Sequence, residues 1–177
     1  MFEKSNLFSK TEGKVLDFIS RSESELYEKE IAKKVGISIS TANLILNSFA
    51  KLGLVSKTKR GKMSFYRASI NNPALKQFKV YNNINNLMPL IKKLSPLSKR
   101  IILFGSCASG TNTQRSDVDL MVISSEKDRL RRILDDYPNT QAVIMNSMEW
   151  ASLSKKDKPF YDRVTRGIVL WEDGHGS

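Results

Sequence analysis

Gly105 and Ser106 are followed, after ten residues, by Asp117 and Asp119. These residue types at this spacing could hold a phosphorylated ligand and a metal ion. Glycine lets the backbone turn sharply and come close to a ligand, and Ser106 adds a hydroxyl group. The small residues that follow at 107–111, Cys-Ala-Ser-Gly-Thr, can begin a short helix whose free N–H groups would face a phosphate.

Asp117 and Asp119 should project from the same face of a strand, because side chains alternate between the two faces. Val118 and Leu120 would then point into the core. Two carboxylates on one face repel each other unless a cation joins them, and hard oxygen ligands of this kind suit Mg²⁺. Two such ions could activate an attacking hydroxyl group and stabilise a leaving pyrophosphate during displacement at the α-phosphate of a nucleotide.

The flanking sequence predicts the strands that position these groups. Residues 100–104 form a short apolar run typical of a buried strand, and a second strand is expected at 117–124. Downstream, residues 128–137 indicate a helix, residues 141–146 a strand, and residues 147–153 the start of another helix.

The chain here resembles the minimal nucleotidyltransferases of the DNA polymerase β-like superfamily, which carry Gly-Ser, ten residues and Asp-X-Asp. The matching residues are Gly105, Ser106, Gly110, Ser116, Asp117, Asp119 and Leu120. The resemblance implies that Asp117 and Asp119 are catalytic carboxylates that bind Mg²⁺, two ions if the protein is catalytic. It also implies that an NTP such as ATP is bound by Gly105, Ser106 and Ser116.

The resemblance extends over roughly residues 89–172, and the segment from Pro159 resembles the closing helix and short strand of these domains. Arg163 and Arg166 in that segment could reach phosphates, although a solvated helix surface is the default interpretation.

One expected group is missing. Nucleotidyltransferases of this kind usually carry a third carboxylate on a later strand, where it helps to hold the catalytic metal and can take the proton of the attacking hydroxyl. The corresponding strand, residues 141–146, contains no acid. Asp135, Asp136 and Glu149 lie near it in the sequence and are interpreted as solvated charges. The chain could therefore bind nucleotide and metal while catalysing slowly or not at all.

The charge distribution is the second strong feature. The net charge is +11, and residues 31–116 contain no Asp or Glu but 15 Lys and Arg residues. Residues 1–80 carry +8 of this charge and the remainder carries +3. Such an asymmetry indicates that the N-terminal part has a polyanionic partner.

The N-terminal part has the periodicity of three helices and a hairpin. Thr11 can cap the first helix, residues 28–35 predict a second, and Ser38 can cap a third that Gly53 closes. The basic tip 59–62 then joins two strands. The apolar positions of the third helix are Ala42, Ile45, Leu46, Phe49 and Leu52.

This order resembles a winged helix-turn-helix domain of the bacterial and archaeal regulator type, over about residues 7–70. The resemblance implies that the third helix enters the major groove of double-stranded DNA, while the hairpin contacts phosphates beside it. The alternative is a basic helical domain that packs against a partner protein. The expected DNA-binding residues are Ser40, Thr41, Asn43, Asn47, Lys51, Lys57, Lys59, Arg60 and Lys62.

A helical connector is expected between the two parts. Pro73 can open a helix, but residues 82–86, Asn-Asn-Ile-Asn-Asn, favour a weakened segment or turn and make a hinge plausible. Pro89 then fits the first turn of another helix. The apolar positions of the connector could equally form the contact of a homodimer, which would present two recognition helices to paired half-sites.

The chain is therefore expected to be an α+β protein with three parts. These are a winged helix-turn-helix domain at 1–72, the connector at 73–88, and a small mixed-sheet α/β nucleotidyltransferase-like domain at 89–177. The single cysteine, Cys107, excludes an internal disulfide, and the single histidine, His175, leaves no evident partner for thiol catalysis. Without an apolar run of membrane-spanning length or a signal peptide, no membrane contact and a cytoplasmic location are expected.

Two functions follow from this organisation. The first is an enzyme that transfers a nucleoside monophosphate to a hydroxyl group, and the intact Gly-Ser and Asp-X-Asp motif favours it. The second is a DNA-binding regulator whose nucleotidyltransferase-like domain senses a ligand, and the missing acid favours it. An antitoxin-like protein that acts on a protein acceptor or toxin partner remains open.

Overall fold

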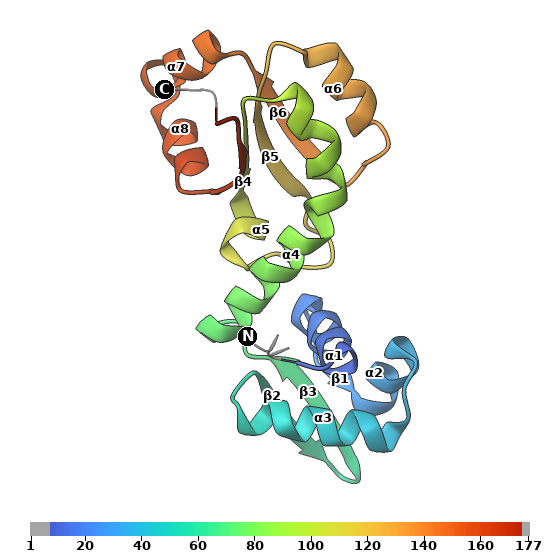
Figure 1. Cartoon of the computed structure of the whole chain (residues 1–177). Helices are drawn as coiled ribbons and strands as arrows, with labels where there is room; N and C mark the ends of the chain where they lie inside the picture. Colours follow the sequence, from blue (N-terminus) through green and yellow to red (C-terminus); the bar gives the residue numbers. More distant parts are fainter. Residues whose placement is uncertain (1–7, 175–177) are drawn as a thin grey trace, which may run out of the picture. The chain divides into compact units, whose positions relative to one another are not determined.

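The structure is a computed structural model that describes residues 8–174. The chain divides into two compact units, Met1–Lys76 and Gln77–Ser177, which are described separately (Figure 1). Among the described residues, no helix is both long and apolar enough to cross a membrane.

The first unit, within residues 8–76, packs helices against a three-stranded antiparallel sheet of strand order β1-β3-β2. The helices are α1 (Lys10–Arg21), α2 (Glu28–Val35) and α3 (Ile39–Lys51), and the strands are β1 (Leu26–Tyr27), β2 (Val55–Arg60) and β3 (Met63–Ala68). The apolar positions of the helices meet in one core, because each helix buries a single face. Its most buried members are Val15, Leu16, Ile19, Ile31, Ala42, Leu46, Phe49 and Tyr66.

Three local details of this unit differ from the sequence-based expectation. Ser9, not Thr11, caps α1, since Ser9 Oγ accepts from the Glu12 N–H at 3.2 Å and Glu12 returns a carboxylate to the Ser9 N–H at 2.8 Å. Leu52 follows the last turn of α3 and is 61% exposed instead of buried. Strand β1, which pairs with β3, was not expected, because two residues are too short to show an alternating pattern.

The expected hinge in residues 82–86 is wrong, because α4 (Pro73–Leu94) is one uninterrupted helix that contains Pro89. Asn72 caps its start, with its side-chain oxygen 2.8 Å from the Ala74 N–H. The helix continues through the asparagine run because one side of it is buried, from Asn83 and Leu87 to Leu94, and tertiary packing outweighs weak helix propensity. Pro89 and Asn85 are both exposed, so water can satisfy the carbonyl group that proline leaves without a donor.

The second unit is built on a four-stranded mixed sheet of order β6-β5-β4-β7. Its strands are β4 (Arg100–Phe104), β5 (Val118–Ile123), β6 (Thr140–Met145) and β7 (Ile168–Glu172), and its helices are α5 (Gly105–Ser109), α6 (Lys127–Leu134), α7 (Ser147–Lys156) and α8 (Lys158–Thr165). A short 3-10 helix, η1 (Ser95–Leu97), joins α4 to the sheet. Strand β4 is antiparallel to β5 and β7, whereas β5 and β6 are parallel.

Helices cover both faces of this sheet (Figure 1). On one face, Leu90 and Leu94 of α4 and Leu130 of α6 pack on Leu103 and Leu120. On the other face, Leu153 of α7 and Val164 of α8 pack on the strands. The strand residues that they cover are Ile102, Phe104, Met121 and Ile123. Because side chains alternate along a strand, Asp119, next to Leu120, lies on the face that α7 and α8 cover.

Candidate functional site

The end of β4 and the start of β5 meet at Gly105 and Asp119. Phe104, the last residue of β4, pairs with Asp119 in the antiparallel register, and the chain then turns at Gly105 with φ +70°. A Cβ atom at Gly105 would overlap the Asp119 carboxylate, with Cγ of Asp119 only 3.2 Å away. Glycine is therefore required at this position for two reasons. The backbone is left-handed, and the Asp119 carboxylate occupies the space that a side chain would need.

The surroundings of Asp119 make its negative charge unfavourable. The pKa of the Asp119 carboxyl group is raised above its ordinary value, and burial is the largest cause. The Arg163 guanidinium lowers this pKa, whereas the Asp117 carboxylate raises it. Desolvation and a like charge both favour the neutral form of an acid. A cation bound between the two carboxylates would remove this unfavourable interaction.

Gln141 occupies the position beside the two aspartates where a third acid would be useful. In the parallel register it pairs with Asp119, and its Nε2 donates a hydrogen bond of 2.7 Å to Oδ2 of Asp117. Asp117 itself is exposed, one residue before β5. Two carboxylates with a neutral amide bound to one of them fit one hard cation such as Mg²⁺, which commonly uses one or two protein carboxylates.

No group of three or more Asp, Glu, His or Cys side chains that could hold a metal ion occurs within residues 8–174. The three acids near the site in sequence form no such group with Asp117 and Asp119. Glu149 forms the capping box of α7 with Asn146 and binds Lys127 at 2.6 Å, and the Lys127 hydrogen bond holds the pKa of Glu149 below its ordinary value. Asp135 and Asp136 are exposed residues that follow α6.

The two serines of the motif have different surroundings. Ser106 is half-buried in α5, and within the described part of the chain its hydroxyl group makes no hydrogen bond. The Ser116 hydroxyl instead accepts the Thr113 N–H at 2.9 Å and closes a turn in the loop between α5 and β5. The structure thus leaves the Ser106 hydroxyl available to a ligand and gives Ser116 a role in shaping the loop.

A hollow of about 480 Å³ adjoins Gly105 and carries a positive charge. Its lining residues are Gly105, Ala108, Ser109, Pro159, Arg163, Arg166 and Gly167, none of them acidic. The Arg163 guanidinium lies over the Phe160 ring at 5.0 Å and the Phe104 ring at 5.7 Å, an arrangement that stabilises a cation above an aromatic face. The sequence singled out Arg163 and Arg166 without placing them, and the fold brings both to the Gly-Ser turn.

Buried polar contacts from α4 hold the loop that connects the two halves of the motif. Asn83 Nδ2 donates to the Cys107 carbonyl at 2.9 Å and to Asn112 Oδ1 at 3.0 Å, and Lys79 Nζ donates to the Asn112 carbonyl. Lys79, Asn83 and Asn112 are each at most 5% exposed. Asn83, one of the asparagines that had indicated a weak helix, therefore supports the candidate site. This role is evident only from its tertiary contacts.

The residues expected to contact DNA form two groups in the first unit. On α3, Ser40 and Lys51 are exposed and Thr41, Asn43 and Asn47 are half-buried. On the hairpin, Lys57, Lys59, Arg60 and Lys62 are all exposed. Lys57 Nζ donates to Asn47 Oδ1 at 2.7 Å and joins the two groups.

Three details of this basic surface were not evident from the sequence. Leu44 is 74% exposed on the same side of α3 as Ser40, one turn away, so the outward stripe of this helix includes an apolar residue. Arg60 pairs with Glu25 at 2.5 Å and lies over the Phe65 ring at 4.8 Å. Thr41 shares a hydrogen bond of 2.8 Å with the cap residue Ser38.

The sequence places the second unit in a known family. The family described as Polymerase beta, Nucleotidyltransferase matches residues 78–175, more than half of the 177-residue chain. The chain therefore belongs to the polymerase beta nucleotidyltransferase family, and the expectation drawn from the Gly-Ser and Asp-X-Asp motif is confirmed at this level. A comparison with curated proteins found no match.

The solved structures that match this chain are only distantly similar to it. A toxin–antitoxin crystal structure with AMP-PNP is 24% identical with a TM-score of 0.36, over 52% of this chain and 75% of that one. TrmBL2, described as an archaeal chromatin protein with a novel mode of DNA binding, is 13% identical with a TM-score of 0.35, over 89% and 72%.

A third structure, human N-acetylserotonin methyltransferase with SAM, is 18% identical with a TM-score of 0.31. It is matched over 45% of this chain and only 28% of that one. All three TM-scores lie below 0.5, and the family assignment therefore depends on the match over residues 78–175.

Proposed function

We propose that the second unit binds a magnesium–nucleoside triphosphate, with ATP as the first candidate. The observation that carries this proposal is the contact of Asp119 with Gly105 at the edge of an arginine-lined hollow. Asp117 and Asp119 would hold Mg²⁺, which neutralises phosphate charge when bound. The turn at Gly105 and Ser106 would hold phosphate oxygens, and Arg163 and Arg166 would contribute positive charge beside them.

The same site favours binding over rapid transfer of a nucleoside monophosphate. Transfer to a hydroxyl requires a group that takes the hydroxyl proton. Gln141, which lies beside Asp117 and pairs with Asp119, is an amide and cannot take a proton at neutral pH. We infer that the unit is a ligand-responsive module with little catalysis.

The first unit is proposed to be a winged helix-turn-helix domain that binds double-stranded DNA. The helix order, the hairpin and the absence of acidic residues from Ile31 to Ser116 support this proposal. In it, Ser40, Asn47 and the neighbouring positions of α3 would read base edges, and Leu44 would contact a thymine methyl group. Lys59 and Lys62 at the hairpin would bind phosphates.

The nucleotide proposal is tested by titrating the full chain with ATP in the presence and absence of Mg²⁺. We expect binding that requires Mg²⁺ and that is lost in Asp117→Asn/Asp119→Asn. Asp136→Asn, which removes an exposed acid outside the site, should bind like the wild type. A wild-type protein that binds no nucleotide under either condition would refute the proposal.

The DNA proposal is tested by measuring affinity for a mixed duplex against salt concentration. Replacing Lys59 and Lys62 by alanine should weaken binding. It should also reduce the slope of log affinity against log salt concentration by the amount expected for about two phosphate contacts. Lys155→Ala/Lys156→Ala removes the same charge from the end of α7 and serves as the matched control. An unchanged slope in the hairpin variant would remove the hairpin from the interface.

The alternative is an enzyme that transfers a nucleoside monophosphate to a hydroxyl group, including one on a toxin partner. The intact Gly105, Ser106, Asp117 and Asp119 favour this alternative. Incubation with α-labelled ATP and candidate acceptors distinguishes the two, because only the enzyme forms labelled product.

A further inference from the structure

Strand β6 is an open edge of the second sheet. It pairs with β5 on one side and is the last strand in the order β6-β5-β4-β7. Its residues, Thr-Gln-Ala-Val-Ile-Met, include no charge, proline or glycine. Natural edge strands usually carry such residues because they prevent another chain from pairing, so β6 lacks the usual protection.

The opposite edge of the same sheet is protected. The pairing of β7 with β4 shifts register between Ile101 and Ile102, and an irregular edge pairs poorly with a further strand. Glu172 of β7 also forms an ion pair with Arg100. The contrast singles out β6 as the edge on which another strand could form a regular ladder.

The peptide groups of β6 are directed suitably for such pairing. The Val118 N–H bonds the Asn139 carbonyl at 2.9 Å, and the Ser124 N–H bonds the Met145 carbonyl at 2.8 Å. In a parallel ladder, the N–H and carbonyl groups of every second residue form hydrogen bonds with the neighbouring strand. The odd-numbered residues of β6 therefore form the hydrogen bonds with β5. Ala142 and Ile144 therefore direct their N–H and carbonyl groups toward the open edge.

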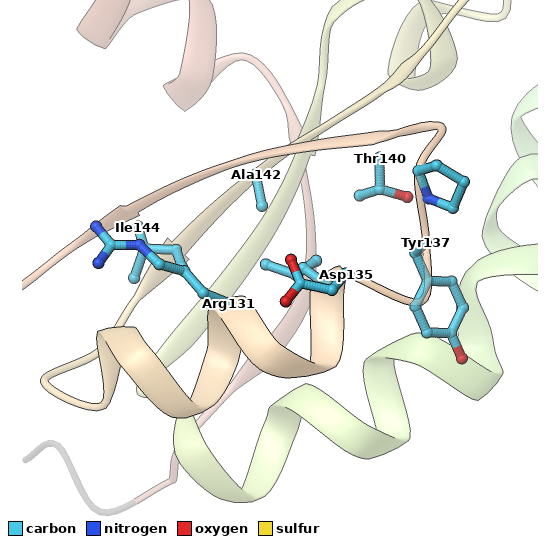
Figure 2. Close-up of a pocket in the computed structure, with 8 residues that line it drawn as sticks. Arg131, Asp135, Tyr137, Thr140, Ala142 and Ile144 are labelled. Atoms are coloured by element: carbon cyan, nitrogen blue, oxygen red, sulfur yellow. The ribbon is translucent and has the colours of Figure 1, made fainter.

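A hollow of about 380 Å³ lies between β6 and α6, immediately beside this edge. Figure 2 shows Ala142 and Ile144 along the strand and Arg131 and Asp135 along the helix. Arg131 and Asp135 are one helical turn apart, have opposite charges and are both exposed; Arg131 also forms an exposed ion pair with Asp128 at 3.1 Å. A two-fold axis beside the strand would therefore bring Arg131 of each copy opposite Asp135 of the other copy. Such a surface is self-complementary, as a symmetric dimer requires.

We propose that β6 is the interface between two copies of this protein. The partner's β6 adds antiparallel across a two-fold axis near Val143, and Ala142 and Ile144 exchange backbone hydrogen bonds between the copies. The two α6 helices then lie side by side, with Arg131 opposite the partner's Asp135. Charge repulsion is modest at this interface, because residues 81–177 carry only +3 of the +11 net charge. The inference is independent of nucleotide binding.

The first test measures the mass of the full chain by sedimentation across a range of protein concentrations. We expect a dimer for the wild type and at least about tenfold weaker association for Ala142→Pro. Proline at this position removes an outward N–H and leaves the ladder with β5 intact. Thermal unfolding of the variant checks that the unit remains folded.

A second test exchanges the charges on α6 without changing the strand. Arg131→Asp and Asp135→Arg should each weaken the dimer, because like charges then face each other. The double variant should restore association. Since the exchange also restores the pair one turn apart within α6, thermal unfolding of the single variants in dilute protein distinguishes a contact between copies, which leaves it unchanged, from a contact within the helix, which lowers it. Arg129→Asp makes the same change in net charge on α6, outside the hollow, and should dimerise like the wild type.

Amide hydrogen exchange gives a readout that needs no substitution. The Ala142 and Ile144 amides should exchange rapidly in dilute protein and slowly in concentrated protein, whereas the Val143 amide, bonded to β5, should be protected in both. A chain that stays monomeric at every concentration overturns the proposal. So does a dimer that survives both Ala142→Pro and the single charge reversals, since its interface must then lie elsewhere.

Discussion

Gly105, directly after β4, and Asp119 of β5 are in contact: the carboxylate of Asp119 fills the space in which a side chain at Gly105 would lie. The antiparallel pairing of Phe104 with Asp119 brings Gly105 and Asp119 together, although thirteen residues lie between them in the sequence. The turn proposed to bind phosphate and the carboxylate proposed to bind Mg²⁺ are therefore a single structural unit.

Gly105→Ala tests this contact. A Cβ at this position needs a left-handed backbone and displaces Asp119, so we expect a loss of about 1–3 kcal/mol in the free energy of unfolding together with loss of Mg²⁺-dependent nucleotide binding. Gly13→Ala is the control, because Gly13 lies inside α1 with no atom within 4 Å of its would-be Cβ. That substitution should stabilise the chain by about 0.5–1 kcal/mol. Equal effects from both would contradict the contact.

Asp119→Asn should stabilise the metal-free protein at neutral pH. The pKa of Asp119 is raised above 3.8 in the folded state, so the folded protein binds this proton more readily than the unfolded chain. The resulting destabilisation is present above the folded pKa and disappears as pH falls through it toward 3.8. Thermal unfolding at several pH values should show a small advantage for the variant that shrinks on acidification. If the stability advantage of Asp119→Asn instead grows at acidic pH, the pKa of Asp119 is not raised in the folded protein.

Mg²⁺ should raise the melting temperature of the wild type and leave that of Asp119→Asn unchanged. The proton and the cation compete for the same carboxylate, so the increase caused by Mg²⁺ should decline as pH falls through the raised pKa of Asp119. Asp136→Asn, at an exposed position, is the matched control and should retain the increase.

Gln141→Glu restores an acid next to Asp117 without changing the size of the side chain. Because its amide now lies 2.7 Å from Asp117 Oδ2, the new carboxylate should repel Asp117 in metal-free protein and lower its stability. Mg²⁺ would relieve this repulsion, so its affinity should rise about tenfold or more, and product formation from labelled ATP should increase. Gln77→Glu, at an exposed position on α4, is the control. Unchanged Mg²⁺ affinity in Gln141→Glu would contradict the proposed role of this position.

Asn83→Ala should destabilise the second unit by about 1–3 kcal/mol, because it leaves the Asn112 side chain and the Cys107 carbonyl buried with one partner fewer. Asn86→Ala changes an exposed asparagine one turn away on the same helix and should stabilise it by about 0.5 kcal/mol. Faster amide exchange at Gly110–Asn112 in Asn83→Ala alone would show that α4 holds this loop. Similar stability for the two variants would contradict that role.

The strands that carry the motif, the motif itself and the family could all be predicted from the sequence. The apolar run at residues 100–104 predicted β4, and the strand expected at residues 117–124 corresponds to β5 at Val118–Ile123. The spacing of Gly105, Ser106, Asp117 and Asp119 predicted a nucleotidyltransferase, and the match over residues 78–175 confirmed it. These features are local, so short segments are sufficient to reveal them.

The residues that surround the motif could be identified only from the three-dimensional fold. The asparagine run in α4 had favoured a hinge, but burial of Asn83 against the Cys107 carbonyl and Asn112 makes it part of a continuous helix. Gln141 lies beside Asp117 because β6 runs parallel to β5, and Arg163 reaches Asp119 because α8 packs on that face of the sheet. Such contacts join residues far apart in sequence, and their energies depend on burial and register, which no local pattern encodes.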